Sequence, residues 1–337
     1  MKKHIIVGLT AILSGALLFA QNQPGSAQPQ AQSKPKPPPP PTYLTPETAG
    51  QDWLDQGEYV NNWGGAQVIA LGNDRFRLVI YKGGLPGAGW DKSPKTEIEG
   101  KRTENGDIAF TNKDNGWVYT ISKGTLTIKT DNNQTYTMTK TNRVSPTLGA
   151  KPPQGAIVLF DGSNCDAWQG GHFDELGRKL LAAGCKSKQS FKDFILHVEF
   201  YLPFKPTARG QERGNSGVYL QDRYEIQVLD SFGLKGEDNE CGGIYGQAKP
   251  LVNMCFPPLT WQTYDVDFTA ARFDESGKKI KNAVVTIKHN GVVIHDNLEL
   301  KGPTGGGKKE DPSDGPIQLQ GHGNPVFYRN IWIVEKK

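Results

Sequence analysis

The side chains best suited to acid–base chemistry lie on the polar sides of two short runs in which apolar and polar residues alternate. In Tyr224–Asp230, Glu225 and Gln227 alternate with apolar neighbours, and in Ile317–His322 the polar positions end at His322. Alternate side chains of a β-strand share one face. We therefore expect Glu225 and His322 to point away from the core, where a carboxylate and an imidazole can serve as general base and general acid.

Amides and a phenol accompany these two residues on the same faces. They are Asn215, Tyr219, Gln227 and Gln320. An ordinary solvent-facing strand favours Lys, Glu and Thr, whereas these planar donors and acceptors match the hydroxyl groups of a sugar. Gly217 would weaken the strand that contains it, and close approach of a ligand is one reason to find glycine there. The alternative is a routine solvated sheet with a glycine bulge.

Arg329 breaks the alternation of the last predicted strand. It shares the side of Phe327, Ile331 and Ile333, which are apolar. A charged side chain in that position is either buried against a carboxylate or displaced by a bulge. We expect a buried arginine paired with a carboxylate.

The elements that must position these residues are β-strands, which makes the fold class all-β. Short runs rich in Val, Ile, Thr, Tyr and Phe, separated by Gly, Asn-Gly and Asp-Asn pairs, are typical of a sandwich or a barrel. The sequence His289-Asn290-Gly291 between two apolar runs predicts a tight type I′ hairpin. A short helix is predicted at Glu175–Gly184. Strands are predicted at 66–71, 76–81, 96–101, 108–111, 117–122, 125–130, 135–140, 157–160, 195–202, 217–221, 224–229, 262–269, 283–289, 292–297, 317–320 and 326–334.

The N-terminal residues predict export. Two lysines, an apolar run over Ile5–Phe19 and small residues up to Ala27 follow the order of a signal peptide, residues 1–27. The apolar run is shorter than the roughly 20 residues that span a bilayer. Residues 28–42 are a Pro-rich stretch that we expect to be a disordered spacer. The protein is therefore expected in the periplasm, on the cell surface or in the medium, without a transmembrane segment after cleavage.

Two β domains are predicted after the spacer. A small β-rich accessory domain covers residues 43–150, and a larger domain covers residues 155–337, with a Pro-containing boundary between them. Two domains are the better expectation because the remaining chain is longer than one compact core usually holds. No His, Cys or paired carboxylates gather in the first domain, so we expect the chemistry in the second.

Charge and cysteines restrict the partners. The formal net charge is +4 and the basic residues are dispersed, so no nucleic-acid partner is predicted. An exported chain with an even number of cysteines indicates two disulfides, Cys165–Cys185 and Cys241–Cys255 in the most local pairing. Free buried thiols and a zinc site are the alternatives. No metal or cofactor is predicted, because no His-x-His or carboxylate cluster has ligand spacing.

Seven segments in register carry a resemblance to a known family. They are IVLFDGSNCDAW (157–168), NSG (215–217), YEIQVLD (224–230), GGIYG (242–246), WQTYDVD (261–267), the Asn290-Gly291 hairpin, and IQLQGHG with FYRNIWI (317–323 and 327–333). In order and spacing the region resembles the 3-keto-disaccharide hydrolase family. That resemblance implies a concanavalin-like jelly-roll sandwich with a carbohydrate groove on its concave face, and cleavage of glycosides already oxidised at C3. The loop 240–258 with its cysteines, and Gly321 before His322, depart from the family pattern.

A keto group at C3 explains why two conventional carboxylates are unnecessary. Ordinary glycosidases place two carboxylates across the bond, but Glu225 and Asp230 are five residues apart and fall on opposite faces unless a bulge intervenes. The ketone acidifies the C2 proton, so a base can remove it and the enolate can expel the C1 substituent. Hydrolysis and elimination followed by hydration both remain open.

These considerations give named candidates for each role. Glu225 and His322 are candidate base and acid in either order, with Asp230 as a further catalytic candidate. Candidates for binding the hydroxyls or the enolate are Asn215, Tyr219, Gln227, Gln320 and Arg329. The alternatives are a carbohydrate-binding module that uses the same groove without turnover, and a structural protein of the cell surface.

Overall fold

The computed structural model describes residues 39–337, and from Pro40 onward they form one compact unit. The predicted signal peptide and most of the predicted spacer lie outside the described residues. Helix α1 (Pro46–Asp55) starts at a proline, which suits the first helical turn, and is interrupted at Gly50, where φ is 75°. No helix within residues 39–337 has the length and apolarity needed to cross a membrane.

Eight antiparallel strands after α1 close into a barrel, because β1 pairs with both β2 and β8. Their inward side chains alternate with outward ones, as the sequence predicted. The sequence prediction missed β1, a strand of four residues that the closed barrel requires. The strands are β1 Gly57–Val60, β2 Gly64–Gly72, β3 Arg75–Lys82, β4 Thr96–Arg102, β5 Ile108–Thr111, β6 Val118–Ser122, β7 Thr125–Lys129 and β8 Thr135–Thr141.

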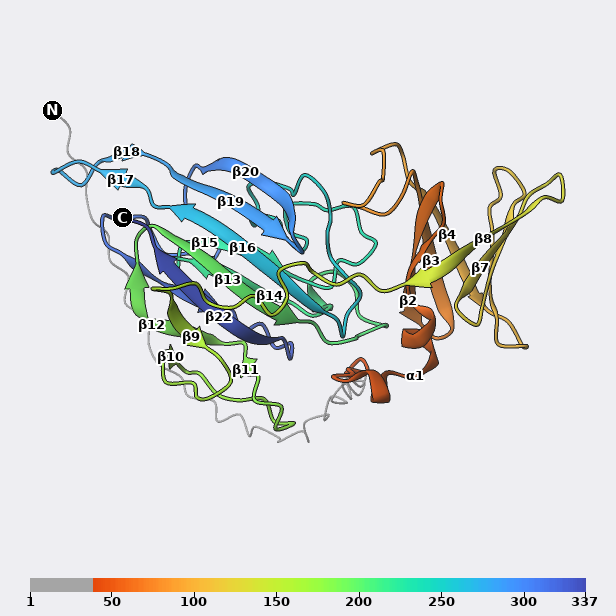
Figure 1. The fold of residues 1–337 in the computed structure, drawn as a ribbon, viewed down its shortest axis with the longest axis horizontal. Helices are drawn as coiled ribbons and strands as arrows, with labels where there is room; N and C mark the ends of the chain where they lie inside the picture. Colours follow the sequence, from red (N-terminus) through yellow and green to blue (C-terminus); the bar gives the residue numbers. More distant parts are fainter. Residues whose placement is uncertain (1–38) are drawn as a thin grey trace, which may run out of the picture. The chain divides into compact units, whose positions relative to one another are not determined.

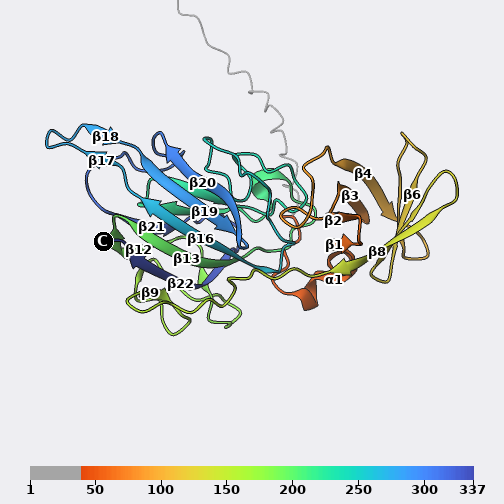
Figure 2. The ribbon, with the colours of Figure 1, turned by 45° about the horizontal axis from the view of Figure 1, so that its top comes forward.

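The rest of the chain forms a sandwich of a five-stranded and a seven-stranded sheet. The five-stranded sheet has the order β10-β12-β21-β14-β15, and the other has the order β11-β22-β13-β16-β19-β20 with β9 beside β22 (Figure 1). Figure 2 shows β20, β19, β16, β13 and β22 in this order across the larger sheet. The strands are β9 Ile157–Phe160, β10 Trp168–Gln169, β11 Leu181–Ala182, β12 Cys185–Phe191, β13 Phe194–Tyr201, β14 Ser216–Leu220, β15 Tyr224–Val228, β16 Trp261–Thr269, β17 Arg272–Phe273, β18 Lys279–Lys281, β19 Ala283–His289, β20 Val292–Leu300, β21 Gly315–Leu319 and β22 Phe327–Glu335.

Alternation along the strands decides which side chains fill the sandwich. Val218 of β14 and Ile226 of β15 belong to one large buried cluster together with Leu196 of β13 and Val266 of β16. The neighbouring residues of β14 and β15 therefore lie on the outer face of the five-stranded sheet. The all-β sandwich predicted from the sequence is confirmed.

The predicted hairpin is confirmed, and the predicted short helix is wrong. Asn290 and Gly291 have φ values of 50° and 81°, as a type I′ turn requires. Residues 175–180 instead form a loop that leads into β11, and residues 183–184 form a bend after it. The carboxylate of Asp174 accepts hydrogen bonds from the Leu180 backbone N–H (3.0 Å) and from Arg178 Nε (2.9 Å). Such side-chain bonds offer the backbone an alternative to the helix.

The barrel and the sandwich share part of their buried surface. The apolar cluster of the barrel also includes Tyr201, Phe204, Leu259 and Phe327, which come from the sandwich part of the chain. The indole N–H of Trp53 donates to the Pro258 carbonyl (3.0 Å). The predicted domain boundary near residues 145–154 stays a prediction.

The two predicted disulfides are wrong for this structure, in which Cys165, Cys185, Cys241 and Cys255 are all free. Cys185, Cys241 and Cys255 are buried in the sandwich core as small apolar side chains. The Cys241 Sγ lies 3.2 Å from the Tyr264 hydroxyl, and the Cys255 thiol donates to the Leu229 carbonyl (3.5 Å). Burial raises the pKa of the Cys185 thiol to about 12, which disfavours the thiolate that disulfide exchange needs.

Candidate active site

A groove of about 250 Å³ lies on the outer face of the five-stranded sheet. It combines residues of β15 and residues that flank β14 and β21 with Gln211 and with two loops far apart in the sequence. Five of the predicted site residues line it together: Asn215, Glu225, Gln227, Gln320 and His322. Alternation on β15 and β14 was therefore sufficient to place these side chains on one surface.

Glu225 is the chemically unusual residue of the groove. Its side chain is buried, with the whole residue only 2% exposed, and burial raises the pKa of its carboxyl from 4.5 to about 7. Tyr219 lies opposite it in the strand register, and the Tyr219 hydroxyl donates to Glu225 Oε2 (2.8 Å). This hydrogen bond acts in the opposite direction and limits the rise of the pKa. A carboxyl that titrates near neutral pH is suited to both giving and accepting a proton.

The Tyr219 hydroxyl can rearrange its hydrogen bonds when Glu225 gains or loses a proton. Its hydroxyl is also 2.8 Å from the Gly305 carbonyl, and it has one proton to donate. When Glu225 is ionised, Tyr219 can donate to the carboxylate; when Glu225 is protonated, Tyr219 can accept from it and donate to Gly305. Burial and the neighbouring Glu225 raise the pKa of Tyr219, so the phenol itself stays protonated. Tyr219 therefore supports Glu225 from below the groove.

The structure explains why residue 217 is glycine, and the reason differs from the one expected from the sequence. A Cβ built on Gly217 would overlap the Oε1 atom of Glu225. Glycine on β14 therefore leaves space for the Glu225 carboxyl across the sheet. The group that approaches Gly217 closely is therefore a side chain of the same protein, whereas the sequence suggested a ligand.

The amides of the groove form a network with unused acceptors. Gln227 Nε2 donates to Gln211 Oε1 and to Asn215 Oδ1, at 3.1 Å each, and Gln320 Nε2 lies 3.3 Å from the Tyr219 hydroxyl. The Oε1 atoms of Gln227 and Gln320 are buried and have no hydrogen-bond partner among residues 39–337. Unpaired buried acceptors are costly.

His322 lies in the segment that follows β21 and is exposed at the groove. Its backbone carbonyl accepts a hydrogen bond from Asn324 Nδ2 (3.2 Å), which holds the segment in place. The imidazole is therefore free to meet a ligand from the rim, whereas Glu225 lies at the floor.

Sequence reasoning missed Gln211, Tyr245, Gly305 and Gly306 as groove residues. Gln211 belongs to the short 3₁₀ helix η1 (Gly210–Glu212), and Tyr245 belongs to a segment hydrogen-bonded to β15 through the Glu225 carbonyl (3.2 Å). Tyr245 lies inside one of the seven family-like segments, which is the only sequence signal that could have indicated it. Loop residues such as Gln211 reach the groove by tertiary folding, which strand periodicity does not describe.

Asp230 and Arg329 are the two candidates that the structure does not bring to the groove. Asp230 follows β15, is buried, and accepts a hydrogen bond from Arg213 Nε (2.6 Å). Arg329 belongs to β22 of the other sheet, where its Nε donates to Glu199 Oε2 (2.7 Å).

The structure explains the irregular position of Arg329. Its guanidinium lies 3.9 Å from the centre of the Trp261 ring and pairs with Glu199, whose side chain is 0% exposed. The register of β13 and β22 shifts at this point, and the next residue, Asn330, has a φ of 44°. The predicted pairing with a carboxylate and the bulge therefore apply together, but the expected burial of Arg329 is wrong, because its side chain is 37% exposed.

Within the part of the chain that the structure describes, no group of three or more His, Cys, Asp or Glu could hold a metal ion. The groove itself offers one carboxyl, one imidazole, two phenols and four amides. These groups can bind hydroxyls and move protons.

Fold and groove together define a β-sandwich with a polar groove and one buried carboxyl. The chain belongs to the family described as the 3-keto-alpha-glucoside-1,2-lyase-like domain, whose model matches residues 155–334. The family predicted from the seven segments is thereby confirmed. No curated protein matches the chain.

Three similar solved structures come from Parabacteroides distasonis, and each is provisionally described as a glycosyl hydrolase. The first is 35% identical, with a TM-score of 0.50, and the match covers 54% of this chain and 84% of that chain. The other two are 16% and 20% identical, with TM-scores of 0.40 and 0.38; each match covers 54% of this chain, and 95% and 99% of the other chains. The family and the first structure support a carbohydrate-acting enzyme as the general class.

Proposed function

We propose that this protein is an exported enzyme that cleaves 3-keto-glycosides, using Glu225 and His322 to move protons. The observation that carries the proposal is the buried carboxyl of Glu225, with its pKa near 7, in a groove lined with amides. Family membership supports the substrate class. Export is supported by the order of residue types in residues 1–27, and sequencing the N-terminus of the mature protein from the periplasm or medium tests it.

The proposed reaction begins with removal of the proton on C2 of the keto sugar. The electrons of the C2–H bond form the enolate of the C3 ketone, and the enolate then expels the C1 substituent as the C1–O bond breaks. The leaving oxygen takes a proton from the acid. Water can add to the resulting unsaturated ketone, so the net result is hydrolysis; release without addition is elimination.

Glu225 and His322 divide the two proton transfers. Glu225 is the better candidate for the base, because its raised pKa makes its carboxylate more basic than an ordinary one at pH 7 to 8. His322 at the rim is then the donor to the leaving oxygen. The remaining N–H groups of Asn215 and Gln320 can donate to the ring hydroxyls and the developing enolate, whereas both N–H groups of Gln227 are already used.

A non-catalytic carbohydrate-binding module is the second candidate. The amides and Tyr245 would bind a sugar equally well in such a protein. A binding groove, however, gains nothing from a buried carboxyl that titrates near neutral pH, and its burial lowers stability at higher pH. This observation favours the enzyme.

Turnover of a 3-keto-disaccharide distinguishes the two candidates. We expect the purified wild-type protein to release free monosaccharide, and Glu225→Gln to do so at least about 100-fold more slowly while it binds the substrate nearly as well. Glu335→Gln, a change of an exposed carboxylate on β22, is the matched control and should behave as wild type. Binding without turnover by the wild-type protein would identify a binding module.

A further inference from the structure

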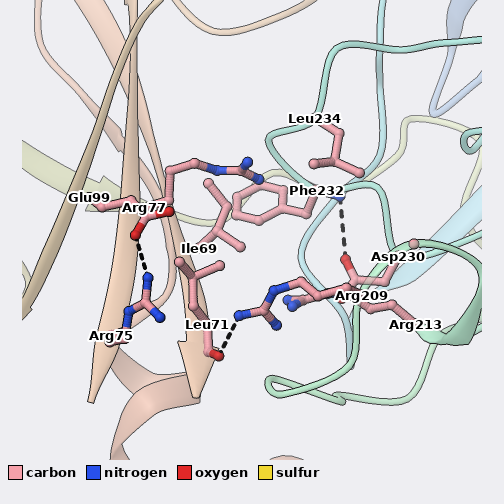
Figure 3. Close-up of a pocket in the computed structure, with 11 residues that line it drawn as sticks. Ile69, Leu71, Arg75, Arg77, Glu99, Arg209, Arg213, Asp230, Phe232 and Leu234 are labelled. Atoms are coloured by element: carbon pink, nitrogen blue, oxygen red, sulfur yellow. Dashed lines mark hydrogen bonds and ion pairs between the residues drawn. The ribbon is translucent and has the colours of Figure 1, made fainter. Parts of the chain in front are cut away.

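A second hollow, of about 210 Å³, lies between barrel strands and two segments of the sandwich. Figure 3 shows Arg75 and Arg77 entering it from the barrel side, and Arg209 and Arg213 from the opposite side. Two carboxylates, Glu99 and Asp230, also line it, and apolar side chains such as Phe232 complete the wall. The lining therefore carries two positive charges in excess.

Two of the four arginines are matched by the two carboxylates. Arg75 Nη2 lies 2.5 Å from Glu99 Oε2, and Arg213 Nε lies 2.6 Å from Asp230 Oδ2. The pair of Arg75 is exposed, whereas the pair of Arg213 is buried. Because each carboxylate already has its arginine, the excess charge belongs to the other two side chains.

Arg77 is the most weakly paired of the four cations. Its Nε atom is buried and has no hydrogen-bond partner among the described residues. Its Nη1 atom is 3.9 Å from the partly exposed Glu97, too far for a hydrogen bond. In Figure 3 its side chain extends from β3 towards Phe232, across the hollow. The buried Nε–H of Arg77 is therefore a donor without an acceptor.

Arg209 has only neutral partners. Its guanidinium donates to the carbonyls of Pro206 (2.6 Å), Ala208 (2.7 Å) and Leu71 (2.7 Å). Burial lowers the pKa of Arg209, and the neighbouring Arg213, Arg75 and Arg77 lower it further. The four cations are therefore close enough to repel one another.

We propose that this hollow, which we call the arginine pocket, binds an oxyanion group, a carboxylate or a sulfate, with Arg77 as its principal contact. Guanidinium groups bind such groups through two parallel N–H···O bonds, and they do so most strongly where water is excluded. An anion would accept hydrogen bonds from the exposed part of the Arg77 guanidinium and reduce the repulsion around Arg209.

The size and lining of the arginine pocket indicate that the anion is part of a larger molecule. Its volume of about 210 Å³ corresponds to roughly seven water molecules at about 30 Å³ each. Leu71 and Phe232 offer apolar surface beside the guanidinium groups. A ring that carries a carboxylate or a sulfate, such as an acidic sugar, has the required combination of an anionic and an apolar side.

The arginine pocket lies next to the groove along the chain. Arg209 and Gly210 line the arginine pocket, whereas the following residue, Gln211, lines the groove and accepts hydrogen bonds from Asn215 and Gln227. An anion held by Arg209 would therefore restrain η1 and, through it, the amide network. This inference does not depend on the proposed reaction, because it concerns binding alone.

Calorimetric titration at constant ionic strength tests the proposal. We expect glucuronate or glucose 6-sulfate to bind the full-length protein, neutral glucose to bind at least about tenfold more weakly, and Arg77→Gln to reduce anion binding at least about tenfold. Lys281→Gln, which removes an exposed charge on β18, should leave binding unchanged. The carboxylate and sulfate probes identify which anion is preferred, and equal weakening by the two variants would overturn the proposal.

A melting-temperature measurement keeps the test decisive if a variant is unstable. Without an anion, Arg77→Gln should melt at the same temperature as wild type or higher, because it removes a weakly paired cation from a cluster with excess positive charge. With saturating glucuronate or sulfate sugar, wild type should become the more stable of the two. Failure of every anion to bind or to raise the melting temperature of wild type would overturn the proposal.

Discussion

Replacement of Glu225 by glutamine should stabilise the protein at alkaline pH. The wild-type carboxyl has its pKa raised by burial from 4.5 to about 7. Between these values the folded protein keeps a proton that the unfolded chain releases, so wild-type stability falls as the pH rises from 4.5 through 7. Below pH 4.5 both states are protonated and the penalty is absent.

The size of the effect follows from the pKa difference. A rise of about 2.5 units corresponds to about 3 kcal/mol at 1.36 kcal/mol per unit. Because Glu225 is 2% exposed, solvent screening reduces this value little. Glutamine retains an oxygen that can accept from the Tyr219 hydroxyl, so the variant loses no hydrogen bond there. We therefore expect a gain of about 1–3 kcal/mol at pH 8.5 and almost none at pH 4.5.

Urea unfolding of wild type and Glu225→Gln at pH 4.5, 6.0 and 8.5 measures this difference. Other groups also titrate over this range, but they are common to both proteins and cancel in the comparison. Glu335→Gln serves as the exposed control and should show no such trend. A difference between Glu225→Gln and wild type that stays constant with pH would refute a raised pKa at Glu225.

Three further results are expected. Tyr219→Phe removes the hydrogen bond that lowers the pKa of Glu225, so the rise of kcat/KM with pH should shift to higher pH. An unshifted pH profile would exclude Glu225 as the base. Arg329→Gln should lower the free energy of unfolding by about 2 kcal/mol through loss of its bond to buried Glu199, with KM unchanged; a raised KM would return Arg329 to the site. Denatured, unreduced protein should show four titratable thiols, and none would restore the two disulfides.

Alternation predicted the groove residues because strands fix side-chain direction locally. Glu225 and Gln227 occur on one side of β15 whatever the rest of the chain does, and the apolar Ile226 and Val228 decide which side is buried. The same rule does not reach beyond the end of a strand. Asp230 lies two residues after β15, where the backbone turns to meet Arg213, and no periodicity describes its direction.

Contacts between distant segments were beyond sequence reasoning. The closure of β1 on β8, the position of Gln211 at the groove, and the arginine pocket all depend on loops brought together by the whole fold. The short helix expected at residues 175–184 failed for a related reason, since a single carboxylate, that of Asp174, organises the loop. The two disulfides were predicted from the even number of cysteines and the expected export. Neither feature indicates how the four thiols are buried in the fold.

The fate of the hydrogen on C2 of the substrate tests the proposed reaction most directly. A 3-keto-glycoside that carries deuterium at C2 should lose the label to solvent as the C1 substituent is released, with a primary isotope effect on turnover, and an enzyme-free sample corrects for spontaneous exchange. Glu225→Gln should slow both label loss and release by at least about 100-fold. Release of the C1 substituent with the deuterium retained at C2, or unchanged rates in Glu225→Gln, would contradict removal of that proton by Glu225.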